Sequence, residues 1–242
     1  MTTDNETTIP QCWEDVQDVL DAGIDRVLLY GPPGTGKTYA GLTFGNVGAG
    51  AYRLVCTEDM TSADVTGCWM PSKDGGWQWL DGQAVKAWRG DGLSGGRLIV
   101  DEVDKASGDV FALLLAVTDS RESAAWENPA SGRVERPRDG FSVVMTTNVE
   151  ELRELPDALT DRFPVRVRID QPHPEALKRL SHDLRGYATR SADLGERRIS
   201  LRTFYAFDQL RTNLADEAKA ARIIFGDRAE GILDAIAIDK VA

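Results

Sequence analysis

The stretch "LLYGPPGTGKTYAGLT", residues 28–43, decides the fold of this chain. An apolar run ends there at glycines and prolines, and a helix-like pattern resumes at Lys37 and Thr38. It contains the pattern G-x-x-x-x-G-K-[ST], whose glycines allow backbone N–H groups to close around phosphate oxygens at a helix N-terminus. The lysine adds a positive charge at the outer phosphates, and the threonine hydroxyl is a ligand for Mg²⁺. The predicted cofactor-binding residues of this loop are Gly31, Pro32, Pro33, Gly34, Thr35, Gly36, Lys37 and Thr38.

Short apolar runs alternate with helix-like stretches on both sides of this loop. The runs span residues 26–30, 52–56, 97–100, 141–147 and 164–169. The first four are almost continuously apolar, which is typical of parallel strands covered by helices on both faces. In the last run Val165 and Val167 alternate with Arg166 and Arg168, which predicts a strand with one face in solvent. The pattern favours an α/β doubly wound sheet of three layers.

The chain is predicted to have three parts. Residues 1–24 form a polar tail followed by a short amphipathic helix, and residues 25–170 form the nucleotide-binding core. After "QPHP" at residues 171–174 the strand pattern disappears and only helical periodicity remains. We therefore expect residues 171–242 to be a small all-helical unit.

The segment "LIVDEVD", residues 98–104, supplies carboxylates where a hydrolytic site needs them. An apolar strand ends there in two adjacent acidic residues, at the sheet edge where ligands bind in such folds. Asp101 is expected to hold Mg²⁺ through its water shell, which makes Thr38 and Asp101 the predicted metal site. Glu102 is expected to orient and deprotonate the attacking water. The alternative is a strand that ends in a solvated acidic turn.

Two more polar residues lie next to predicted strands. Asn148 ends the next apolar run in "MTTN" and is a candidate for holding the water or the γ-phosphate; otherwise it is a turn-forming asparagine. Arg162 in "LTDRF" precedes the last predicted strand and is a candidate arginine finger for a neighbouring subunit. Its alternative is an ordinary surface arginine.

The composition narrows the range of partners and compartments. The chain has 39 acidic and 28 basic residues and a formal charge of -11, which disfavours non-specific binding to nucleic acid or anionic membranes. Its three cysteines, Cys12, Cys56 and Cys68, do not have the spacing of disulfide pairs or of metal ligands. The two histidines do not complete a zinc-binding pattern with them. The N-terminal sequence lacks the pattern of a signal peptide, and no apolar run has the length of a membrane span. We expect a soluble, cytoplasmic protein.

In combination, these residues resemble the AAA+ ATPase superfamily. "GPPGTGKT" matches its Walker A motif, "LIVDEVD" its Walker B motif, Asn148 its sensor 1 and Arg162 its arginine finger. Arg202 in "RISLRTF" matches the sensor 2 arginine of the family's helical lid. The resemblance implies a P-loop NTPase fold, with a three-layer αβα parallel sheet and a small C-terminal helical lid over residues 171–242. It also implies Mg²⁺-dependent ATP hydrolysis, with Glu102, Asn148, Arg162 and Arg202 as catalytic residues.

Two further segments are similar to the MoxR-like branch of this superfamily, a dynein-related type with a hairpin inserted in its second helix. They are "DVTG" with the Gly- and Trp-rich stretch after it, and "WENPASGRVERPRDGF". The resemblance implies a hexameric ring that remodels or activates a partner protein, with a von Willebrand A domain protein as a candidate. The inserted hairpins then face the ring pore or partners. Alternatively, the tryptophans only pack the insert on the core, namely Trp69, Trp77, Trp79 and Trp88.

Two other functions remain open at this point. A P-loop kinase or GTPase shares the phosphate loop, although the guanine-reading "NKxD" pattern is missing from the sequence. An ATP-driven switch on DNA would use local basic residues, namely Arg133, Arg136 and Arg138, against the acidic character of the whole chain.

Overall fold

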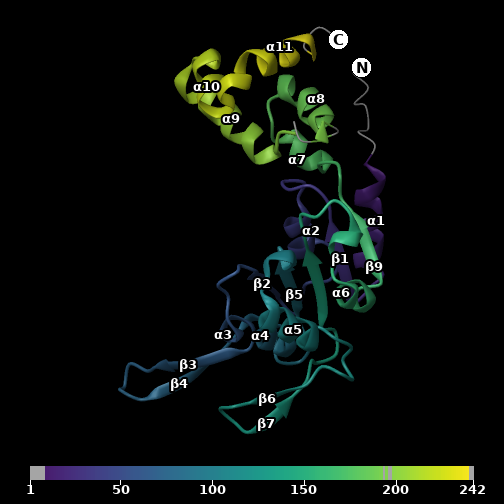
Figure 1. The fold of residues 1–242 in the computed structure, drawn as a ribbon, viewed down its shortest axis with the longest axis vertical. Coiled ribbons are helices and arrows are strands. Elements are labelled where there is room, and N and C mark those ends of the chain that lie inside the picture. Colours follow the sequence, from purple (N-terminus) through teal and green to yellow (C-terminus); the bar gives the residue numbers. More distant parts are fainter. Residues whose placement is uncertain (1–8, 193, 196–197, 240–242) are drawn as a thin grey trace. The chain divides into compact units, whose positions relative to one another are not determined.

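The computed structural model describes residues 9–192, 194–195 and 198–239, which form two compact units. The core unit comprises residues 15–31 and 37–168. The helical unit comprises, within the described residues, 9–14, 32–36 and the chain from residue 169 onward. Helix α1 (Gln11–Asp21) contributes residues to both units. Figure 1 shows the elements of each unit.

A five-stranded parallel sheet forms the centre of the core unit, in the order β2-β5-β8-β1-β9. Its strands are β1 (Arg26–Tyr30), β2 (Ala51–Val55), β5 (Arg97–Asp101), β8 (Ser142–Thr146) and β9 (Val165–Arg168). All five lie within one residue of the runs predicted from the sequence. The prediction of a three-layer α/β fold is confirmed.

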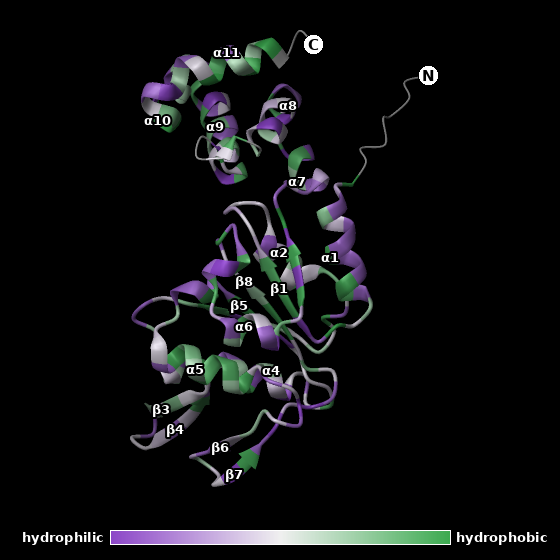
Figure 2. Ribbon diagram, turned by 45° about the vertical axis from the view of Figure 1, so that its right-hand side comes forward, coloured by the Kyte–Doolittle hydropathy of each residue, from purple (hydrophilic) through white to green (hydrophobic). Residues whose placement is uncertain are grey.

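Helices cover both faces of this sheet. Helix α2 (Lys37–Thr43) lies so close to one face that a Cβ added at Gly41 would approach Val144 at 3.1 Å and Ile99 at 3.4 Å. On the other face, Trp88 and Leu114 pack with the sheet in one buried cluster. They belong to α4 (Gln83–Arg89) and α5 (Gly108–Val117). The hydrophobic colours of the central strands in Figure 2 agree with burial on both faces.

Strand β2 departs from the expectation that its apolar residues are covered. Of its five residues only Leu54 is buried, and Val55 is 42% exposed. The reason is its position, because among the described strands β2 lies at the edge of the sheet and pairs with β5 alone. An apolar sequence run therefore predicted the strand correctly but not its burial.

Two β-hairpins extend from the core unit, as the sequence resemblance implied (Figure 1). The first pairs β3 (Gly67–Pro71) with β4 (Trp77–Asp81) and lies between the one-turn helix α3 (Ser62–Val65) and α4. The second pairs β6 (Trp126–Asn128) with β7 (Arg133–Glu135) and lies between α5 and β8. The tryptophans of this region differ in burial, so packing on the core accounts for only some of them, and a pore or partner contact stays a prediction. Trp77 is 69% and Trp69 46% exposed, whereas Trp88 of the following helix is buried.

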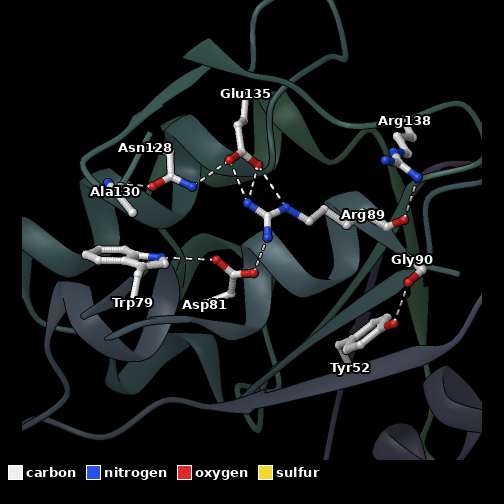
Figure 3. A network of polar contacts seen from close by, with 9 residues as sticks. All are labelled: Tyr52, Trp79, Asp81, Arg89, Gly90, Asn128, Ala130, Glu135 and Arg138. Atoms are coloured by element: carbon white, nitrogen blue, oxygen red, sulfur yellow. Dashed lines mark hydrogen bonds and ion pairs between the residues drawn. The ribbon is translucent and has the colours of Figure 1, made fainter. Parts of the chain in front are cut away.

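Arg89 joins the two hairpins through its guanidinium group (Figure 3). Its Nη2 donates to Glu135 at the end of β7 at 2.6 Å, and its Nη1 contacts Asp81 at the end of β4. The Trp79 indole donates to Asp81 at 3.0 Å, and its ring centroid lies 5.8 Å from that of Trp126. This contact pattern fixes each hairpin to helix α4 and to the other hairpin.

Replacing Arg89 with Met is expected to loosen both hairpins together. The change leaves two neighbouring carboxylates, Asp81 and Glu135, without their shared cation, at a cost on the order of 1 kcal/mol for this partly exposed site. Limited chymotrypsin digestion should then cleave after Trp77 several times faster than in the wild-type chain. Arg89→Lys keeps one charge but not the planar fork, so it should give an intermediate rate. Equal cleavage of all three chains would contradict the coupling of the hairpins.

The remaining elements of the core unit are short turns and one helix that follow β5 and β8 in the chain. They are the 3₁₀ turns Val103–Lys105 and Leu152–Glu154 and helix α6 (Asp157–Arg162). The Arg97 side chain is buried, and its guanidinium donates a hydrogen bond to the Gly41 carbonyl at 3.1 Å, close to the end of α2. The last carbonyls of a helix have no hydrogen-bond donor within the helix, and Arg97 supplies one here.

The helical unit has its own hydrophobic core, with Phe204 and Phe207 completely buried. Its helices are α7 (Pro174–Lys178), α8 (His182–Ser191), α9 (Leu201–Leu214), α10 (Glu217–Phe225) and α11 (Ala229–Asp239). Ser200 caps α9 by accepting a hydrogen bond from the Thr203 backbone N–H at 3.3 Å. The predicted C-terminal helices are therefore confirmed. Among the residues described, no helix has both the length and the apolar character needed to cross a membrane.

Candidate functional site

The carboxyl edge of the central strands holds the residues that the sequence motifs predicted. Asp101 ends β5, Asn148 follows the neighbouring β8, and Gly31 follows β1. Backbone hydrogen bonds tie these segments together, since Gly31 N–H donates to the Val149 carbonyl at 3.0 Å and Thr147 N–H to that of Leu29 at 3.1 Å. Parallel pairing of the strands therefore places the motifs at one edge.

The phosphate loop has the backbone conformation that its glycines predict. Gly31, Gly34 and Gly36 have φ angles of 119°, 77° and 111°, in a region of backbone conformation that residues with a Cβ rarely adopt. Lys37 begins α2 and is 5% exposed, and its Nζ donates to the Gly31 carbonyl at 2.6 Å. The lysine thus folds back onto Gly31, the residue with which the phosphate-binding motif begins.

Within the helical unit, two glycines of the loop lie against other segments. A Cβ at Gly34 would lie 2.8 Å from the Cβ of Ser200, and one at Gly36 would lie 3.2 Å from the ring of Trp13. The Trp13 indole donates to the Gln171 carbonyl at 2.9 Å. Its ring meets that of His173 edge-on, with 5.0 Å between centroids. The sequence predicted a short amphipathic helix in this region but gave no indication that Trp13 lies against the loop.

Asp101 is the buried centre of the site, with 4% of its surface exposed. Its Oδ1 accepts hydrogen bonds from the hydroxyls of Thr38, at 2.7 Å, and Thr146. Its Oδ2 accepts from Arg53, whose Nε lies 3.1 Å away and whose Nη2 also contacts it. Burial alone raises the pKa of this carboxyl, but the hydrogen bonds from Thr146, Arg53 and Thr38 outweigh it and lower the pKa. Asp101 is therefore held as a carboxylate.

Glu102 has an unusual backbone for a residue with a side chain, with φ 57° and ψ 48°. This left-handed conformation costs energy in a non-glycine residue and is common at functional sites. Its N–H donates to the Thr146 hydroxyl at 3.2 Å, while its carboxylate accepts from Asn148 Nδ2 at 3.3 Å and Lys105 Nζ at 2.5 Å. The predicted water-activating carboxylate and the predicted sensor amide are therefore in contact.

The other two predicted catalytic residues are arginines at the end and the beginning of helices. Arg162 ends α6, and its Nε donates to Asp119 Oδ2 at 3.3 Å, with one third of its side chain exposed. Arg202 is the second residue of α9 in the helical unit and its side chain is exposed. In the part of the chain that the structure describes, Arg162 is not one of the donors to Asp101 or Glu102.

Three residues of the site were not predicted from the sequence, namely Arg53, Thr146 and Lys105. Thr146 lies in the "MTTN" run, and a hydroxyl residue at the end of an apolar strand could have been predicted as part of the site. Lys105 follows Glu102 by three residues, a spacing that brings side chains together in a helical turn. Arg53 gave no signal, because its contact depends on which strand lies beside β2.

Cys56 directly follows β2, its N–H donates to the Asp101 carbonyl at 2.8 Å, and it is completely buried. Burial is the main reason that its thiol pKa is raised to about 12, and the negative charges of Asp101, Asp104 and Glu102 add to the shift. All three cysteines are free, as their spacing predicted. A thiol with so high a pKa is almost entirely protonated at neutral pH, so Cys56 acts as a packing residue.

A family comparison agrees with this geometry. The profile of the AAA domain, dynein-related subfamily, matches residues 26–163, which is more than half of the 242 residues. The chain belongs to this family. It is therefore an ATPase of the AAA type, as the motifs predicted.

Two solved structures support the fold. Two crystal structures of NtrX from Brucella abortus align with TM-scores of 0.53 and 0.51 at 15% and 16% identity. The alignments cover 88% and 85% of this chain but only 50% and 49% of the NtrX chains, and the second of these structures is a complex with ATP. A Cytophaga hutchinsonii protein aligns over 95% of this chain and 68% of its own, at 16% identity and a TM-score of 0.48. No curated protein matches the sequence.

Proposed function

We propose that this chain is a Mg²⁺-dependent ATPase of the MoxR-like type, which assembles into a ring and remodels or activates a partner protein. One observation carries the catalytic part of the proposal. Thr38, Asp101, Glu102 and Asn148 form one continuous hydrogen-bonded cluster with Thr146 at the edge of the sheet where the phosphate loop begins. One of the NtrX crystal structures is a complex with ATP, which supports nucleotide binding by a chain of this fold.

The donor set fits Mg²⁺. A hydroxyl and a carboxylate, Thr38 Oγ1 and Asp101 Oδ1, lie 2.7 Å apart, and hard oxygen ligands of this kind suit the ion. Within the described ranges, no cluster of three or more His, Cys, Asp or Glu side chains offers a rival metal site. Mg²⁺ needs no such cluster, because it usually keeps waters and takes one or two carboxylates together with phosphate oxygens. The ion supplies charge neutralisation at the phosphates when it is bound.

Each residue of the cluster then has a distinct task. Loop N–H groups and Lys37 bind the phosphates, since both present positive charge at the start of α2. Glu102 accepts the proton of the attacking water, which requires its carboxylate to be free of competing donors. Asn148 positions the Glu102 carboxylate through their 3.3 Å contact. Lys105, at 2.5 Å from Glu102, competes with the water for the same carboxylate.

The ring assembly rests on the position of Arg162. This residue stands in the arginine-finger motif, yet in the single chain it pairs with Asp119 rather than with the cluster around Asp101. We propose that a neighbouring subunit receives Arg162 at its nucleotide, in a hexameric ring. Arg202 of α9 is proposed as the matching arginine of the helical lid.

The hairpins are the proposed contact with the partner protein. They carry exposed apolar side chains at Trp69, Trp77 and Val134, the last with 63% of its surface exposed. Exposed apolar groups that gather on one element typically mark interaction sites. A partner with a von Willebrand A domain remains the candidate that the resemblance implies. A DNA partner is less favoured, because Arg136 and Arg138 already donate to carbonyls of this chain, at Glu122 and Arg89.

Phosphate release from ATP tests this function directly. We expect release with Mg²⁺, loss of release when EDTA removes the ion, and a rate per subunit that rises with protein concentration as rings form. GTP should be a poorer substrate, and duplex DNA should leave the rate unchanged at low salt. Hydrolysis that persists in EDTA, or that depends on DNA, would contradict the proposal.

A further inference from the structure

Strand β2 brings a basic side chain to the carboxylate at the centre of the site. It pairs with β5 in parallel, with Arg53 opposite Ile99 and Val55 opposite Asp101. Because side chains alternate along a strand, Arg53 and Asp101 extend from the same face of the sheet. The guanidinium reaches forward to Asp101 Oδ2, to which Nε donates at 3.1 Å and Nη2 donates as well.

The donors of this cluster divide between the two carboxylate oxygens. Thr38 and Thr146 donate to Oδ1, whereas both donors to Oδ2 come from Arg53. A buried carboxylate is costly unless a cation and hydrogen bonds compensate it. The side chain of Asp101 is 6% exposed, and in the described part of the chain its ion pair is with Arg53.

We propose that Arg53 is a positioning residue that replaces the divalent cation as the counter-ion of Asp101 while no nucleotide is bound. The inference rests on the proposed Mg²⁺ site. Arg53 neutralises the carboxylate from Oδ2, whereas Oδ1 lies 2.7 Å from Thr38 Oγ1, where the cation would be held. When Mg²⁺ binds, it adds its own positive charge close to Arg53, so the two cations disfavour each other.

The surroundings of Arg53 allow such an exchange. Its side chain is 46% exposed, and it lines an open pocket of about 540 Å³ together with Thr57 and Lys86. A shorter side chain at this position therefore opens no closed cavity in the core. Substitutions of Arg53 should act through Asp101 and leave the packing of the sheet unchanged.

Melting temperatures in two states of the site test this role. The chains are the wild type, Arg53→Gln and Arg53→Lys, each measured in EDTA and in saturating Mg²⁺ with ADP. In EDTA, Arg53→Gln should melt about 2–4 °C below the wild type, which corresponds to a modest loss in a chain of this size. With Mg²⁺ and ADP the difference should fall to less than half, and Arg53→Lys should recover part of the loss because it keeps the charge without the fork.

A matched control and a second readout separate this role from a purely structural one. Arg168→Gln removes an arginine of similar exposure, 47%, from the opposite edge strand β9, and it should shift both states equally. Arg53→Gln should also lower the Mg²⁺ concentration that gives half of the stabilisation by ADP severalfold, since a competing cation is gone.

Two results would overturn the inference, and they differ in what else they affect. In the first, the melting temperature of Arg53→Gln lies equally far below that of the wild type in both states, while Mg²⁺ and ADP raise the melting temperature of the wild type. Arg53 is then not a counter-ion that the metal replaces. If the wild type itself does not respond to Mg²⁺ and ADP, the proposed nucleotide site and the role of Arg53 are both wrong.

Discussion

Glu102→Gln is expected to lower the turnover of ATP by about 10²- to 10⁴-fold, the range that general base catalysis contributes. The amide keeps the size and the hydrogen-bonding reach of the side chain but cannot accept the proton of the attacking water. Because the phosphate loop, Thr38 and Asp101 are untouched, the affinity for ATP should stay within a few-fold of the wild type. Steady-state phosphate release and equilibrium nucleotide binding measure the two effects.

The chain offers a close control for this substitution. Glu175 pairs with Lys178 at 2.5 Å with the same three-residue spacing as Glu102 and Lys105, but it lies on α7 of the helical unit. Glu175→Gln therefore removes a similar ion pair and should leave turnover unchanged. Normal turnover in Glu102→Gln would show that another group activates the water.

Arg162→Ala is expected to reduce turnover by about 10³- to 10⁵-fold, as the loss of an arginine finger does in related phosphoryl transfer. The reason is that the guanidinium neutralises charge that develops on the transferred phosphoryl group, which no other proposed residue reaches from the neighbouring subunit. Binding of ATP to each subunit should persist. Arg222→Ala, at an exposed arginine of α10, is the control that should keep full turnover.

Mixing two inactive variants tests whether Arg162 acts across subunits. An Arg162→Ala subunit has an intact Glu102, and a Glu102→Gln subunit has an intact Arg162. When the two assemble side by side, the Arg162→Ala subunit regains a complete site, so activity should return on mixing. No recovery, with mixed rings shown by mass measurement, would mean that Arg162 acts within its own subunit or not at all.

The sequence predicted the fold and the central cluster because both depend on local patterns. Glycine spacing set the phosphate loop, apolar runs set the strands, and parallel strands bring their carboxyl ends to one edge. For this reason Thr38, Asp101, Glu102 and Asn148 were found from motifs that are far apart in the chain, and the structure brings them into contact. Their catalytic roles remain predictions.

What the sequence missed depends on which segments become neighbours in space. The role of Arg53 follows from β2 lying beside β5, and the contact of Trp13 with Gly36 follows from how the helical unit folds. The exposure of β2 has the same origin, since an apolar run looks alike at the edge and in the middle of a sheet. In the proposed ring, the position of Arg162 relative to a nucleotide depends on a second subunit, which a single sequence does not describe.

The most direct test of the central claim is the state of nucleotide bound to the Glu102→Gln chain. Labelled ATP is bound with Mg²⁺, unbound label is removed by a rapid spin column, and the bound label is analysed after a fixed time. We predict that the wild type holds mainly ADP and that Glu102→Gln holds intact ATP, with Lys37→Ala holding little of either. Conversion of bound ATP to ADP by Glu102→Gln at the wild-type rate would contradict the account.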